Sequence, residues 1–129
     1  MSEVYPPQYL AFFERFNGRD YWEAHEVLED LWRLTDNDPF YQGLIILAAS
    51  YVHIYNKNNP SGARKCLLNV KRFLAAYAPA HMGVDVAAIL AHADRCLERI
   101  DALPPGARLL DHIPLLHLEP GRPLVFVAV

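Results

Sequence analysis

The chain has few of the residues that small proteins use to compensate for a limited core. It contains two cysteines, Cys66 and Cys96, whose spacing matches no metal or redox motif. We therefore expect no disulfide scaffold, and a reducing compartment such as the cytoplasm. With 129 residues, 53% of them hydrophobic, the chain is long enough to bury a stable core without disulfides or structural metal ions. A single domain over residues 1–129 is predicted.

The chain also lacks blocks of like charge and long apolar runs. Twelve Lys and Arg against fifteen Asp and Glu give a net charge of −3, without the basic cluster that is typical of nucleic-acid binders. The longest nearly uncharged run, 43–55, is shorter than the about 20 residues that a membrane span needs. The first residues show no signal peptide, and no phosphate-binding glycine loop occurs. We expect a cytoplasmic protein that binds neither nucleic acid nor membrane.

Helical periodicity and clear start and stop signals are what the chain does contain. The apolar spacing predicts a helix that ends at Asn17 and four more over about 20–34, 39–57, 60–78 and 86–102. Asp20 and Glu23 are predicted to form a capping box, and Asp38 is predicted to cap the helix that begins at Pro39. Because the turns are short, an all-α fold of about five short antiparallel helices is predicted, as a bundle or as stacked helical hairpins.

The last segment, 103–129, has a different character. Five prolines exclude a helix through most of it. Two apolar stretches, 113–118 and 124–129, flank a Pro-Gly pair that suits a tight turn. This pattern predicts a C-terminal extended arm or a small β-hairpin. An isolated hairpin is marginal in water, so the arm must dock on the helices or on another chain. A homodimer formed through this arm is therefore a candidate assembly.

Two polar side chains fall among the apolar residues of the predicted helix 20–34. On a helical wheel His25 lies inside the apolar arc, and Glu29 lies between His25 and Trp22. His25 and Glu29 are four residues apart and therefore adjacent on the helix surface. A carboxylate and an imidazole placed between two indoles, Trp22 and Trp32, need hydrogen-bonding partners.

The next predicted helix carries a matching polar arc. Gln42 and His53 lie about 20° apart on its wheel. Counting outward from the turn, Gln42 comes level with Glu29 and Trp32, and His53 comes level with Tyr21. If the two arcs face each other, they form a buried polar line between the helices. The residues of this candidate pocket are Trp22, His25, Glu29, Trp32, Gln42 and His53.

Three interpretations of the polar line stay open. In the first, His25 and Glu29 form a satisfied core pair that fixes the packing of two helices. In the second, His25 acts as an acid or base, oriented by Glu29, in a small-ligand or catalytic pocket. In the third, the two residues bind a divalent metal, since His25-Glu26-x-x-Glu29 is similar to the zinc-binding His-Glu-x-x-His helix. A third ligand is missing, because His53 is offset by about 7 Å along the helix axis.

The same region resembles a known family. The motif runs from Tyr21-Trp22-Glu23-Ala24-His25-Glu26 through Leu28-Glu29-x-x-Trp32 to Tyr41-Gln42-Gly43 and Gly62-Ala63. It is similar to the domain of unknown function family 309 over about residues 10–80. The resemblance implies an all-α domain of short antiparallel helices, and it implies no activity, substrate or cofactor.

From these observations we expect a non-enzymatic interaction or scaffold module, with no cofactor, whose specific function is unknown. The alternative is a metal- or small-ligand-binding protein, such as a hydrolase-like enzyme, that uses the cluster of His25 and Glu29.

Overall fold

A computed structural model describes residues 5–118 and 120 of the chain. This part of the chain contains five α-helices, which confirms the predicted all-α class. They are α1 (Pro7–Asn17), α2 (Tyr21–Leu34), α3 (Pro39–Tyr51), α4 (Pro60–Leu74) and α5 (Val86–Asp101).

Of the two predicted helix caps, one is confirmed and one is wrong. The Asp38 side chain accepts a hydrogen bond of 2.9 Å from the backbone N–H of Phe40, which confirms the cap before Pro39. The capping box at Asp20 is wrong, because its carboxylate accepts no hydrogen bond from the first turn of α2. It lies instead beside Gly18, 3.8 Å from the position that a Cβ would occupy there. The tight turn between α1 and α2 therefore draws this side chain away from the helix.

Short elements complete the helices. α3 continues into a π-helical turn, η1 (Val52–Asn56), so the predicted helix to residue 57 has the right length but a different last turn. 3-10 turns lie at η2 (Ala75–Tyr77) and η3 (Leu109–Asp111). Two antiparallel strands, β1 (Ala80–His81) and β2 (Val84–Asp85), were not predicted, because two-residue strands carry no readable periodicity.

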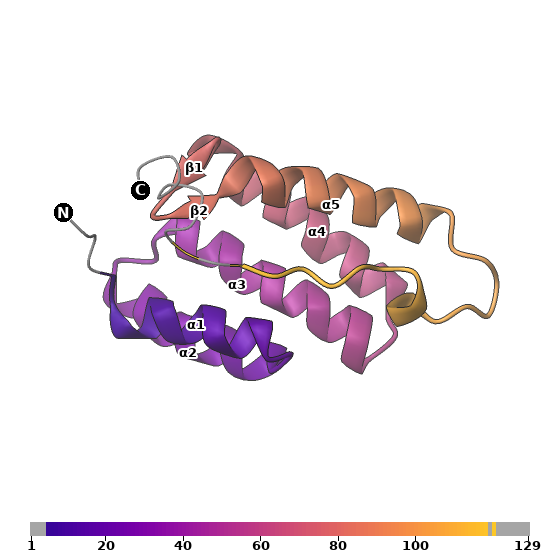
Figure 1. Ribbon diagram of the computed structural model, residues 1–129, viewed down its shortest axis with the longest axis horizontal. Coiled ribbons are helices and arrows are strands. Elements are labelled where there is room, and N and C mark those ends of the chain that lie inside the picture. Colours follow the sequence, from indigo (N-terminus) through magenta and orange to yellow (C-terminus); the bar gives the residue numbers. More distant parts are fainter. Residues whose placement is uncertain (1–4, 119, 121–129) are drawn as a thin grey trace.

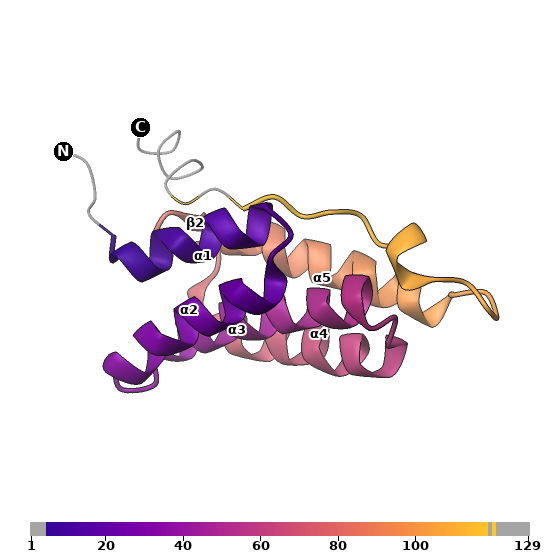
Figure 2. The same cartoon turned by 90° about the horizontal axis from the view of Figure 1, so that it is seen from below.

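The helices form two layers (Figures 1 and 2). α2, α3 and α4 lie side by side in one layer, and α1, α5 and the C-terminal arm lie over them. α3 is the central helix, with the fully buried side chains of Leu44, Leu47 and Tyr51. Its close approach to α4 depends on Gly43, because a Cβ there would overlap the Leu74 side chain.

The C-terminal arm, 103–118, runs back along the helices (Figure 1). It contains a tight turn at 104–107 and the 3-10 turn η3, and it is extended over 114–118. The predicted extended arm is thus confirmed over 114–118, whereas 104–113 form turns. Most of the predicted hairpin turn at 119–122 and the apolar segment 124–129 lie outside the described residues. Within the part of the chain that the structure covers, no helix has the length and apolar content needed to cross a bilayer.

Candidate functional site

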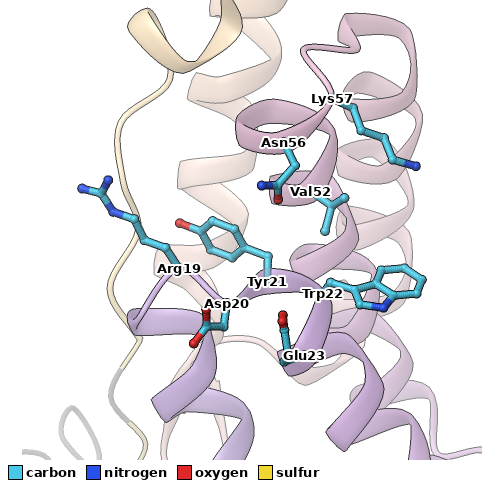
Figure 3. A pocket seen from close by; sticks show the side chains of 8 residues that line it. All are labelled: Arg19, Asp20, Tyr21, Trp22, Glu23, Val52, Asn56 and Lys57. Carbon is cyan, nitrogen blue, oxygen red and sulfur yellow. The ribbon is translucent and has the colours of Figure 1, made fainter.

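A pocket of about 440 Å³ opens where the N-terminus of α2 meets the π-helical turn η1 (Figure 3). Its volume falls within the range of about 300–1,000 Å³ that is typical of ligand sites. The residues that line it are Arg19, Asp20, Tyr21, Trp22, Glu23, Val52, Asn56 and Lys57.

Two local features of the backbone shape this pocket. Arg19 adopts a left-handed conformation with φ of 67°, which non-glycine residues rarely occupy. This residue reverses the chain between α1 and α2 and brings the start of α2 under η1. The π-helical turn supplies the opposite wall through Val52 and Asn56. Such turns are rare, and they often occur at functional sites.

Charged groups of both signs surround the pocket. Arg19 and Lys57 are cationic, Asp20 and Glu23 are anionic, and none of the four makes an ion pair within residues 5–118. The Glu23 carboxylate points toward the centre, whereas Arg19 and Lys57 lie at opposite ends (Figure 3). Burial raises the pKa of Tyr21 to about 12, so its hydroxyl remains a hydrogen-bond donor.

Trp22 is the most exposed aromatic side chain of the pocket. Its side chain is 54% exposed, so the prediction that the whole apolar arc of α2, Trp22 included, packs against other helices is wrong. α2 lies at the edge of its layer and buries only the narrower face of Tyr21, Ala24, Leu28 and Leu31. The indole instead stacks on the ring of His25, with centroids 4.9 Å apart and planes 7° from parallel.

His25 and Glu29 form a half-buried cluster rather than a sealed core pair. His25 Nε2 lies 4.0 Å from Glu29 Oε2, and the two side chains are 19% and 30% exposed. Glu29 accepts a shorter bond of 2.8 Å from Arg33. His25 Nδ1 is buried without a hydrogen-bond partner, and so is Trp32 Nε1. The cluster thus retains hydrogen-bonding capacity that the described residues do not use.

Of the remaining predicted residues, His53 does not join the predicted polar line. Gln42 is half-buried in the first turn of α3. His53 lies against the start of α4, where its Nδ1 is 3.4 Å from Asn59 Nδ2 and 2.6 Å from the Cβ position of Gly62. Burial lowers the pKa of His53, which favours the neutral ring. Its contacts within the described chain are therefore with α4, away from His25.

The metal interpretation gains no third ligand. Among the described residues, no group of three or more His, Cys, Asp or Glu side chains is placed to hold a metal ion. His25 and Glu29 would supply two ligands, fewer than the three or four protein ligands of a typical zinc site.

The structure reveals a buried cluster that the sequence analysis missed. Tyr51 Oη lies 2.5 Å from His92 Nε2, and Cys96 Sγ lies 3.3 Å from the same nitrogen. Burial lowers the pKa of His92 to about 4 and raises that of Cys96 to about 11, so the cluster is uncharged near neutrality. The position of His92 within the apolar stripe of α5, four residues before Cys96, is the signal that could have located it.

Comparisons with known proteins agree with the motif in α2. Residues 9–66 match the family model described as "Domain of unknown function (DUF309)". The chain is 30% identical over 109 residues to the "Uncharacterized protein YpuF" of Bacillus subtilis (strain 168). That alignment covers 78% of this chain and 60% of the relative, so the chain spans about three-fifths of the relative's length. No solved structure matches the chain significantly. The resemblance expected from the sequence is therefore confirmed over residues 9–66, where the chain matches the domain of unknown function family 309.

Proposed function

We propose that the protein is a non-enzymatic helical interaction module that binds a partner protein through the pocket at Trp22. The observation that carries this proposal is the exposed indole beside a pocket whose charged groups make no ion pair among the described residues. Tryptophan, tyrosine and arginine dominate the binding energy of protein interfaces. Two of them are exposed at this pocket, as Arg19 and Trp22.

The chemistry of the pocket favours a protein segment as its occupant. Trp22 and Val52 offer an apolar contact that would suit one aliphatic or aromatic side chain. The cations Arg19 and Lys57 and the anion Glu23 would pair with charges of both signs around that anchor. A protein segment presents such a mixture more readily than a small apolar molecule does.

The half-buried cluster behind Trp22 supports the same proposal. The His25 ring stacks on the indole and holds its orientation, which lowers the entropy lost when a partner binds. The buried Nδ1 of His25 has no hydrogen-bond partner among residues 5–118, although most buried polar atoms have one.

The proposal is tested by chemical cross-linking in the source cells, with three forms of the full chain. We expect one protein to cross-link to the wild type and to a Leu34→Ala control, and not to Trp22→Ala. Leu34 is the matched control because it is 76% exposed at the opposite end of α2. Binding of the identified protein, measured by calorimetry, should weaken at least about 30-fold in Trp22→Ala, as expected for a hot spot of 2 kcal/mol or more.

Two results would contradict the proposal. The captured protein could persist with Trp22→Ala at unchanged yield. Alternatively, a small molecule could raise the melting temperature of the wild type but not of Trp22→Ala, while no protein is captured. The second result would assign the pocket to a small ligand.

Two further expectations accompany the proposal. We place the protein in the cytoplasm, where the free thiols of Cys66 and Cys96 stay reduced. A metal at His25 and Glu29 stays a prediction, and elemental analysis of protein purified without chelator tests it. Near-stoichiometric zinc, iron or manganese that is lost in Glu29→Ala would favour it.

A further inference from the structure

The C-terminal arm is bound to the helices in the way that proteins bind an extended peptide. Asn17 at the end of α1 donates from Nδ2 to the carbonyl of Leu118 at 2.7 Å and accepts from the Leu118 N–H at 2.8 Å. This pairing satisfies both the N–H and the C=O of one residue, as a neighbouring β-strand would.

Tyrosines hold the middle of the arm by its backbone. Tyr55 donates from its hydroxyl to the carbonyl of Ile113 at 2.7 Å, and Tyr51 lies 3.0 Å from the carbonyl of Pro114. Arg99 of α5 donates to the carbonyl of His112 at 3.1 Å. The arm is therefore recognised mainly through its carbonyl groups, which every sequence carries.

Apolar side chains add selectivity to this backbone recognition. Leu109, Ile113 and Leu118 are 0%, 3% and 5% exposed, whereas Leu115 between them is 50% exposed. The three buried side chains are spaced by four and five residues along the arm. Main-chain hydrogen bonds combined with a few side-chain anchors are how grooves bind extended segments of other chains.

We propose that this groove, formed by α1, α3, η1 and α5, also accepts the arm of a second copy, giving an arm-exchanged dimer. The occupant is residues 109–118 of the partner chain. The closed monomer and the exchanged dimer contain the same arm contacts, and they differ only in the hinge and in the dependence on protein concentration. Dimerisation by arm exchange therefore needs no binding surface other than the groove.

The hinge lies between α5 and the arm. The Ala107 N–H donates to the carbonyl of Pro104 at 3.1 Å, and Gly106 has φ of 80°. A proline followed by a glycine with positive φ, closed by this bond, is the pattern of a type II turn. Pro104, Pro105 and Gly106 are all exposed, so the turn can open without disturbing the core.

Gly106 offers a selective way to favour the exchanged form. A Cβ at this position would have no atom within 4 Å, so a larger side chain meets no steric obstacle. Its positive φ is nevertheless unfavourable for any residue with a Cβ, above all a β-branched one. Gly106→Val should therefore weaken the closed turn while leaving the groove and the arm unchanged.

Sedimentation of the full chain at several concentrations tests the proposal. We expect a concentration-dependent dimer in the wild type and a dimer fraction at least five times larger in Gly106→Val at equal concentration. Adding Asn17→Ala and Tyr55→Phe to Gly106→Val should return the dimer to or below the wild-type fraction. A monomer at every concentration in both hinge forms would overturn the proposal. A dimer that is insensitive to the two groove substitutions would overturn it as well.

A disulfide trap guards against variants that fail to fold. In a background with Cys66 and Cys96 replaced by alanine, one chain carries Asn17→Cys and a second chain carries Leu118→Cys. A disulfide-linked pair of the two chains, formed after they are mixed and oxidised, is the expected product. A chain that carries both substitutions is the control for geometry. If it closes its own disulfide while the mixed chains form none, the arm does not exchange.

Discussion

The pocket at Trp22 and the arm groove differ in how their polar groups are paired. In the groove, Asn17, Tyr51 and Tyr55 all bond to the backbone of the arm. In the pocket, Arg19 and Lys57 make no ion pair with the rest of the described chain. The groove is thus a filled site whose polar groups stabilise the fold, whereas the cations of the pocket are left without an ion-pair partner among the described residues.

One aromatic block connects the two regions. The Tyr21 ring lines the pocket and lies 5.1 Å from the Tyr51 ring and 5.9 Å from the Tyr55 ring, between centroids. The last two tyrosines hold the arm. Substitutions in this block should therefore affect stability, whereas those at the rim of the pocket should affect binding alone.

The strongest way to break the filled region is to remove Tyr51. This side chain is fully buried and packs against the rings of Phe16, Tyr21, Tyr55 and His92. We expect Tyr51→Ala to lower the free energy of unfolding by about 3–5 kcal/mol, measured by urea denaturation. Leu115→Ala, on the exposed side of the arm, is the control and should change it by less than about 0.5 kcal/mol. Equal losses of unfolding free energy in the two variants would show that Tyr51 is not a core residue of the arm groove.

The second-largest effect on stability is expected from acid, because protonation of the buried His92 ring destabilises the folded chain. Its pKa is about 4 in the folded chain against an ordinary value of 6.5. Between these values the unfolded state binds more protons, so the free energy of unfolding falls as the pH drops from 6.5 to 4. The loss attributable to this group is at most about 3 kcal/mol. Unfolding measured at pH 7 and pH 4 should show a smaller loss in His92→Gln, and an identical loss would refute the assignment.

The smallest effect on stability is expected beside the pocket, at His25. His25→Ala should lower the free energy of unfolding by less than about 1 kcal/mol, since His25 is 4.0 Å from Glu29 and partly exposed. Glu29 keeps its bond to Arg33, so no buried carboxylate loses its partner. Thermal unfolding tests this, with Glu26→Ala as an exposed control on the same helix. A loss of about 3 kcal/mol would assign His25 to the core instead.

Local signals determined most of the helix boundaries. The helix start at Pro39 was predictable because Asp38 and the proline act within a few residues of each other. Pro60, which follows Asn59, is another case, and the Asn59 side chain accepts from the Gly62 N–H. The capping box at Asp20 failed because its carboxylate is placed by the turn to α1. The π-helical end of α3 was also invisible, since its apolar pattern is that of an ordinary helix.

The candidate site was predictable only in part. Trp22, His25 and Glu29 lie close together because spacings of three, four and seven residues place them on one side of α2. His53 could not be assigned in this way, because its neighbours come from α4. The pocket residues Val52 and Lys57 were also missed, since they reach Trp22 only through the packing of η1 on α2.

The sequence by itself thus determined the helical class, the order of the helices and the contacts within one helix, because these depend on residues a few positions apart. The tertiary structure alone decided which faces stay open. Trp22 is exposed because α2 forms the edge of its layer, and His92 is buried because α5 packs over Tyr51 and the arm. Such burial depends on residues tens of positions apart, whose proximity no local spacing encodes.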